Sequence, residues 1–178
     1  MALSSCTLIG SIPRDCRNSA GGIIEIKVRV LPSASVLAAD YTVTSGTVAI
    51  ANSQGSRSGW YTYYLPKNTA EFKETQKVSN PNGTRAYMQE GTIILNKIQA
   101  SIGRELNAVG QNSIQIAVWD NNDTYRLFGY EFGMDIVTAE AATGTTKEDR
   151  NGYTVKFEGS ERVEAPFMSS ATYATLVT

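Results

Sequence analysis

A regular alternation of apolar and charged residues in the segment 21–32, GGIIEIKVRVLP, limits the fold more than any other feature of the sequence. Isoleucine and valine occupy every second position, and the positions between them hold Glu25, Lys27 and Arg29. Because side chains in a β-strand point to alternate faces, this period of two predicts a strand with one apolar and one charged face. A glycine pair precedes the strand and a proline comes after it, so we expect it over 22–31.

Most of the remaining chain also shows the patterns of strands and tight turns. Residues 69–78 alternate as a polar strand, and the turn sequence Asn80-Pro81-Asn82-Gly83 predicts a hairpin with a strand that begins near Thr84. Residues 59–66 place aromatic side chains on both faces, so we expect a strand that is covered on both sides. Further strands are expected over 41–51 with a break at Ser45-Gly46, 113–119, 124–132, 133–142 and 153–159.

One segment has the period of an amphipathic helix. In residues 92–109, TIILNKIQASIGRELNAV, most gaps between apolar residues are three or four. Three consecutive apolar residues near its start are also compatible with a strand, and Gly110 supplies a stop. Several strands, one helix and several more strands predict an α+β fold that is mainly β. We expect an antiparallel β-sandwich or barrel-like core with one flanking helix at about 92–109.

The length of 178 residues suits a single domain, or a domain with an extended arm. Residues 1–20 are small and polar and predict an N-terminal arm, and residues 21–178 predict one β domain with extended loops. Cys6 and Cys16 could pair if the arm forms a hairpin, but reduced thiols are the favoured interpretation for a cytosolic origin. The sequence has no histidine and no third cysteine, so we expect no zinc site.

Charge and composition exclude several classes of function. The 16 basic and 17 acidic residues give a net charge of −1, whereas general binding of nucleic acid needs a basic excess. No apolar run approaches about 18 residues, and the N-terminus lacks the pattern of a signal peptide, so we expect neither a membrane span nor secretion. Without histidine, the commonest general base and metal ligand is missing. We therefore expect neither an enzyme nor a cofactor.

Two groups of charged residues are candidate contact sites. Glu25, Lys27 and Arg29 carry both signs beside apolar neighbours, so acids could meet bases on another copy of the chain. A monomer with this strand face in water would show the same pattern, and both explanations stay open. The second group lies in the loop 143–152 and consists of Lys147, Glu148, Asp149 and Arg150. It is either a docking loop or, as we favour, a solvated hairpin tip.

Three other candidate sites have simpler explanations. The aromatic run Trp60-Tyr61-Thr62-Tyr63-Tyr64 could stack on sugars or bases, although packing in a core or subunit interface is commoner. Paired carboxylates could act as in a glycosidase, but they must face each other across a cleft, which strand alternation cannot show. Asp120-Asn121-Asn122-Asp123 lacks the ligand spacing of a calcium loop and predicts a turn.

Several motifs resemble those of small virion proteins of tailed phages that infect Bacteroidetes. They are Cys6 and Cys16 before Gly-Gly-Ile-Ile, the segment IQIAVWDNNDTYRLFGYEFG, a loop rich in threonine and glycine, and an Asn-Gly-Tyr strand that ends EGSERVEAPF. Over most of its length the chain is similar to the tail tube and tail-ring subunits of such phages.

The resemblance implies a virion structural protein of the phage tail, made in the cytoplasm of the host bacterium. Such subunits form hexameric rings that can stack, and their sheets join around a lumen through which DNA passes without specific binding. Other copies and other tail or connector proteins are the implied partners, with no catalytic residue and no cofactor. The charged face of 23–31 would meet the lumen or a neighbour, and 1–20 and 143–152 would contact other rings. The alternative is a non-catalytic β-sandwich module that binds a carbohydrate or protein ligand.

Overall fold

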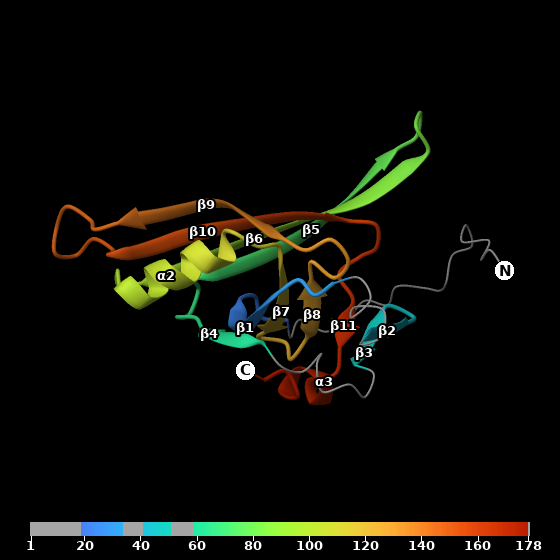
Figure 1. Ribbon diagram of the computed structural model, residues 1–178, viewed down its shortest axis with the longest axis horizontal. Coiled ribbons are helices and arrows are strands. Elements are labelled where there is room, and N and C mark those ends of the chain that lie inside the picture. The colour runs from blue at the N-terminus through green and yellow to red at the C-terminus, as the bar shows by residue number, and fades with distance from the viewer. Residues whose placement is uncertain (1–18, 34–40, 51–58, 178) are drawn as a thin grey trace.

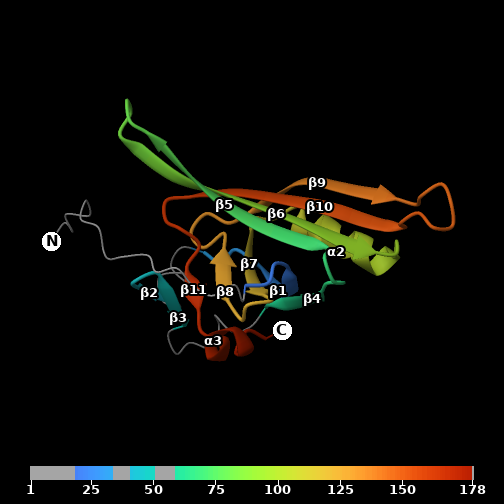
Figure 2. The same cartoon turned by 180° about the vertical axis from the view of Figure 1, so that it is seen from behind.

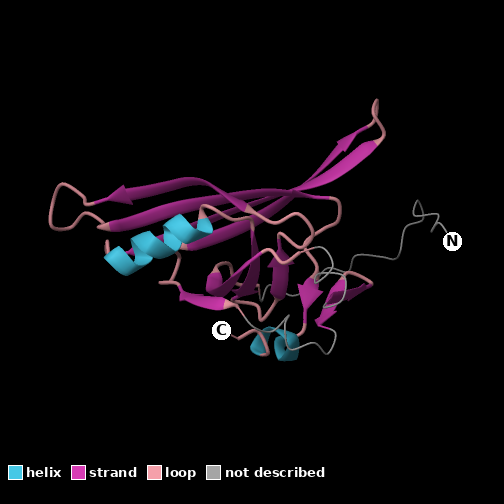
Figure 3. Cartoon of the chain, viewed as in Figure 1, coloured by secondary structure: helices cyan, strands magenta, loops and turns pink. Residues whose placement is uncertain are grey.

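A computed structural model describes residues 19–33, 41–50 and 59–177, which form two packed β-sheets and two helices (Figures 1 and 3). The sheets lie one above the other, and helix α2 (Ala100–Val109) packs on the same side of the upper sheet as the lower one. Apolar side chains from both sheets and from α2 form one core. The predicted α+β, mainly β fold with a sandwich core is therefore confirmed.

The larger sheet has seven strands, and its strand pairs are antiparallel except for one. The exception is the short last strand, which pairs parallel to β3. In the order in which they lie side by side, the strands are β2 (Tyr41–Thr44), β3 (Thr47–Ile50), β11 (Phe167–Met168), β8 (Tyr125–Phe128), β7 (Ile114–Asp120), β1 (Ile23–Val30) and β4 (Tyr61–Tyr64).

The smaller sheet has four longer strands, and every neighbouring pair is antiparallel. The predicted hairpin around Asn80–Gly83 is confirmed, because Ser79 pairs with Thr84 and Gly83 adopts the positive φ of 62° that such a turn needs. Its outer half extends beyond the rest of the molecule (Figures 1 and 2). The strand order is β5 (Ala70–Ser79), β6 (Thr84–Asn96), β10 (Gly152–Glu161) and β9 (Asp135–Ala142).

The period of two in the strands explains how the sheets pack. Every second residue of the facing strands points into the space between the sheets, and burying each such large apolar side chain contributes about 1.5–3 kcal/mol. The buried residues that meet there include Ile26, Val28, Ile93, Ile114, Ile116, Phe128, Val155 and Phe157.

The predicted helix over 92–109 is correct only from Ala100 onward. Residues 92–96 continue β6, because Ile93 and Leu95 reach the core at alternate positions as a strand requires. The chain turns at Lys97, which has a φ of 68°, and α2 then begins. Gly110 comes after the helix as expected, and its N–H donates to the carbonyl of Leu106 at 2.9 Å. The apolar run at the start of this segment is therefore a strand signal.

The edge position of β4 corrects a second expectation. This strand pairs with β1 on one side, and its other side is the edge of the sheet. Tyr61 is 51% exposed and Tyr64 is 80% exposed, so the strand is not covered on both sides. Trp60, just before it, is instead fully buried.

Two turns lie where the sequence predicts them, and a third ends its strand earlier than predicted. The break at Ser45-Gly46 is a tight hairpin turn between β2 and β3, and both residues have positive φ. At the predicted turn after β7, Asp120 Oδ1 accepts hydrogen bonds from the N–H groups of Asn122 and Thr124. Gly129, with a φ of 66°, ends β8 well before the predicted end at 132.

The C-terminal segment covers the outer face of the larger sheet. Helix α3 (Ser170–Ala174) is capped by Ser169, whose Oγ accepts from the N–H of Thr172 at 3.1 Å. Tyr173 and Leu176 are buried there, in a second apolar cluster with Trp60 and Leu127. This tail has no periodic pattern in the sequence. The predicted arm over 1–20 falls outside the described residues up to residue 18, and so do both cysteines.

Candidate assembly surface

The charged side of β1 is covered by the chain itself. Lys27 Nζ donates to the backbone carbonyls of Tyr173 and Leu176, at 3.1 and 2.9 Å, and lies 4.6 Å from the centre of the Tyr173 ring. The Tyr173 hydroxyl donates to Glu25 Oε1 at 3.1 Å. Arg29 is buried, with its guanidinium 5.8 Å from the centre of the Trp60 ring.

These contacts correct the expectation that Lys27 and Arg29 face a lumen or a neighbouring subunit. A period of two shows that a strand has two different faces, but it does not show what covers each face. Burial lowers the pKa of Lys27, and the nearby carboxylate of Glu25 opposes this effect. Two carbonyls and an aromatic ring replace part of the water that the Lys27 ammonium group loses on this face.

The second predicted group lies where the sequence places it, at the tip between β9 and β10, far from β1 (Figure 1). Its charged residues are exposed: Lys147, Glu148, Asp149 and Arg150. Asp149 Oδ2 accepts from the N–H groups of Thr146 and Thr145, both at 2.7 Å, and these bonds lower its pKa. The carboxylate therefore shapes the loop, and this agrees with the favoured interpretation of a hairpin tip.

An uncovered polar surface is formed by the outward face of the four-stranded sheet, here called the polar sheet face. Both α2 and the seven-stranded sheet lie on the opposite side of this sheet, and no described segment packs on the outward face (Figures 1 and 2). The alternation of the strands places lysine, glutamate, threonine and serine on it, with Met88 and Ile94 as the large apolar exceptions. The sequence showed the polar strand 69–78, but not that three more strands extend its face.

The charges of the polar sheet face nearly cancel. Lys73 Nζ and Glu90 Oε2 form an exposed ion pair at 3.2 Å across β5 and β6. Three lysines and four glutamates leave one net negative charge on this face. They are Glu71, Lys73, Lys77, Glu90, Glu140, Lys156 and Glu158.

Both edges of the four-stranded sheet, β5 and β9, are unpaired within the described ranges. Strand edges attract further strands, and proteins that stay monomeric usually protect them with lysine, proline or a cover. Along β9 the exposed middle consists of Val137, Thr138, Ala139, Glu140 and Ala141, with neither lysine nor proline. Four strands in alternating directions leave β5 and β9 antiparallel to each other.

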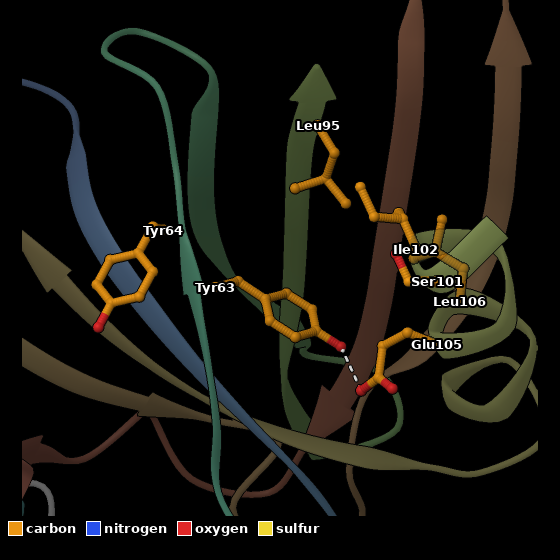
Figure 4. A pocket seen from close by; sticks show the side chains of 7 residues that line it. All are labelled: Tyr63, Tyr64, Leu95, Ser101, Ile102, Glu105 and Leu106. Atoms are coloured by element: carbon orange, nitrogen blue, oxygen red, sulfur yellow. Dashed lines mark hydrogen bonds between the residues drawn. The ribbon is translucent and has the colours of Figure 1, made fainter. Parts of the chain in front are cut away.

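An apolar pocket of about 340 Å³ opens between β4 and α2 (Figure 4). The Tyr63 ring lies across the gap from Ile102, and the Tyr63 hydroxyl donates to Glu105 Oε1 at 3.0 Å. Burial raises the pKa of Tyr63, and the carboxylate of Glu105 raises it further. The lining residues are Tyr63, Tyr64, Leu95, Ser101, Ile102, Glu105 and Leu106.

The described residues hold no group of three or more Cys, Asp or Glu side chains that could bind a metal ion. In the same part of the chain, no helix is long and apolar enough to cross a membrane. Comparisons with models of protein families, with curated proteins and with solved structures find no match to this chain.

Proposed function

We propose that this chain is a virion structural protein, a subunit of a ring or tube in a phage tail that forms a channel for DNA ejection. It acts by self-assembly. The observation that carries the proposal is the four-stranded sheet with one uncovered polar face and two edges that pair with no described strand. The motifs that resemble tail tube and tail-ring subunits point the same way.

The directions of the strands suit closure into a ring. Because β5 and β9 run in opposite directions, β9 of one copy can pair antiparallel with β5 of a copy rotated about a common axis. The pairing is head to tail, so it uses two different edges and continues until the ring closes. All copies then share one continuous antiparallel sheet without free edges.

A ring of six copies would enclose a wide channel. Neighbouring strands lie about 4.8 Å apart, so about 24 strands would give a circumference of about 115 Å and a backbone diameter of about 37 Å before strand tilt widens it. Barrels of about 16–18 strands already hold an aqueous channel. With α2 and the larger sheet on the outside, the polar sheet face lines the channel.

The composition of the polar sheet face suits a channel through which DNA slides. A lumen that held many unpaired lysines would bind phosphates and release counterions, and DNA would then be retained. Here the lysines are matched by glutamates, and each copy contributes one net negative charge. Weak repulsion of the phosphates favours passage without specific binding.

The proposal is tested by changing one edge residue. Ala139 lies in the exposed middle of β9, and Ala139→Lys adds the kind of charge that blocks edge pairing. We expect the unchanged protein to form rings or tubes in negative-stain micrographs and the variant to remain a monomer by light scattering. Ser160→Lys is the matched control, since it adds the same charge at an exposed position of the central strand β10. A monomeric unchanged protein, or equal assembly of both variants, contradicts the proposal.

A ligand-binding module is a second candidate, supported by a cluster of three aromatic rings beside α3. The rings of Trp119 and Tyr125 stack at 5.6 Å, and the Tyr125 and Tyr173 rings lie 5.0 Å apart beside an open pocket. The buried Trp60 named from the sequence is not available for this role. Binding of a glycan panel by a monomer, lost in Trp119→Ala, would favour this function over assembly.

A further inference from the structure

The outer half of the β5–β6 hairpin is basic and carries one large exposed hydrophobic side chain, Val78. Between Thr75 and Gln89 the sequence contains Lys77 and Arg85 but no acidic residue. Val78 is 61% exposed and is paired directly with Arg85 across the hairpin. Lys77 points to the opposite face of the hairpin, so Arg85 is the cation beside Val78. An exposed valine beside a cation on a projecting hairpin is poorly explained by the stability of the isolated chain.

The pocket between β4 and α2 has the complementary properties. Its floor is formed by Leu95 and Ile102, which are partly open to solvent, and by the buried Leu106. Among the described residues that line it, Glu105 is the one with a charge, and its carboxylate can accept more hydrogen bonds than the one from Tyr63. The pocket therefore suits an aliphatic side chain that is accompanied by a cation.

The two features lie at opposite ends of the same strand. Arg85 is near the start of β6 and Leu95 is near its end, so ten residues at about 3.3 Å each separate them by about 33 Å. Figures 1 and 2 show the hairpin tip at one end of the four-stranded sheet and α2 toward the other. Because the strands between them are rigidly paired, the hairpin cannot reach the pocket of its own chain.

We propose that the β5–β6 hairpin of one copy docks into the pocket between β4 and α2 of another copy, with Val78 in the apolar floor and Arg85 beside Glu105. This inference rests on the proposed function, because it describes how one ring meets the next. The contact joins two different surfaces along the strand direction, so it does not close and repeats from ring to ring. A tube, rather than a single ring, is the result.

Disulfide crosslinking between two different chains tests this contact directly. Both chains carry Cys6→Ser and Cys16→Ser; one also carries Val78→Cys on the hairpin and the other Ser101→Cys on the pocket rim. Mixing them under mild oxidation is expected to give a crosslinked dimer on a denaturing gel. Val30→Cys, exposed at the end of β1, replaces Val78→Cys in the matched control and is expected to give at least tenfold less product. Equal yields from the two mixtures would overturn the docking.

A second measurement separates docking from ring formation. Val78→Glu places an acid beside Glu105 and removes the buried aliphatic contact, while the folded chain tolerates it because the side chain is exposed. We expect single rings in micrographs instead of stacked rings. The protein concentration needed for stacking should rise about tenfold or more. Val30→Glu is expected to stack like the unchanged protein.

The outcomes distinguish the two proposals. Stacks that persist in Val78→Glu overturn the docking and leave the ring proposal intact. An unchanged protein that forms no rings under any condition overturns the proposed function itself. If a small apolar molecule or an unrelated peptide fills the pocket and Val78→Cys gives no crosslink, the occupant is not a second copy and the inference fails.

Discussion

The charged faces of two strands in this molecule, β1 and β5, differ in whether the chain covers them. The charged side of β1 is covered by the chain's own C-terminal segment, whereas the charged side of β5 belongs to a sheet face on which no described segment packs. Three charged residues share one face in each strand: Glu25, Lys27 and Arg29 in β1, and Glu71, Lys73 and Lys77 in β5. The difference lies in the surroundings of each strand, since α3 returns over the larger sheet and the smaller sheet lies at the outside of the sandwich (Figure 1).

The covered face shows how a sheet can bury charge. Lys27 is surrounded by two carbonyls, an aromatic ring and the carboxylate of Glu25, so its loss of water is compensated locally. Lys73 on the polar sheet face has one exposed partner, Glu90, and otherwise faces solvent. We infer that charged residues on a strand indicate a surface for another molecule only where no other segment of the same chain covers them.

Removal of the aromatic ring of Tyr173 from the covering segment should destabilise the fold strongly. Tyr173→Ala removes a buried ring that contacts Trp119, Tyr125 and Lys27, and it removes the hydrogen bond to Glu25. We expect the free energy of unfolding to fall by about 3–5 kcal/mol. Chemical denaturation, at a protein concentration where light scattering reports a monomer, measures it.

The matched control for this change is Tyr64→Ala. Tyr64 is 80% exposed at the edge of the same sheet, so its removal is expected to change the free energy of unfolding by about 0.5 kcal/mol or less. If the two tyrosine variants lose the same amount, the C-terminal segment does not cover β1 in solution. The charged side of β1 would then be available to a neighbouring subunit after all.

Local features of the fold were predictable from the sequence, and the covering of faces was not. The alternation in β1 and the turn residues around Gly83 act over a few residues, and both elements form where the pattern indicates. The apolar run of Ile93, Ile94 and Leu95 is compatible with a buried helical turn as well as with a strand. Only its pairing with β10 in the folded chain makes it a strand. The covering of Lys27 depends on residues almost 150 positions later, for which no local signal exists.

The same limit applies to the candidate site. The loop residues Lys147 to Arg150 were identified correctly as a hairpin tip, because turn chemistry is local. The polar sheet face was missed as a unit because its four strands come from two distant parts of the chain. The pocket beside Tyr63 was missed for a similar reason, since β4 and α2 meet only in the folded sandwich.

Gly91 and Thr92 are neighbours on β6 and point to opposite sides of the smaller sheet. They allow the core side of this strand to be compared with the polar sheet face. Gly91 faces the core, where an added Cβ would lie 2.5 Å from Cε1 of Phe72, whose ring packs at 5.2 Å from that of Phe128. We expect Gly91→Ala to lower the free energy of unfolding by about 1–2 kcal/mol. This net loss already includes the roughly 0.5–1 kcal/mol gained by replacing a glycine within a strand.

The control on the polar sheet face is Thr92→Val, which keeps the branched shape of the side chain and replaces only its hydroxyl. Thr92 points to the polar sheet face beside Glu71 and Lys156, so a change of about 0.5 kcal/mol or less is expected from the same denaturation measurement. A larger loss in Thr92→Val than in Gly91→Ala would show that the assignment of inner and outer faces is wrong.

Glu161 and Glu158 both lie on β10, and the contribution of a buried glutamate to stability depends on pH. Glu161 is buried, and its Oε1 accepts from three successive N–H groups, those of residues 131–133, while Oε2 has no partner among the described residues. Burial raises the pKa of Glu161, although the three backbone hydrogen bonds oppose this. Glu158, on the same strand, is exposed on the polar sheet face.

The sign of the effect is set by linkage between protonation and folding. A carboxyl whose pKa is higher in the folded chain favours folding while it is protonated, and this contribution is lost as pH rises from about 4.5, its ordinary value, through the raised value. Glu161→Gln mimics the protonated group, so its unfolding free energy relative to the unchanged protein should increase as pH rises through this window. Glu158→Gln should show no such trend. A flat difference for Glu161→Gln would mean that the three N–H groups stabilise the ionised carboxylate enough to cancel its burial, and that a buried anion on this strand costs the fold no more than an exposed one.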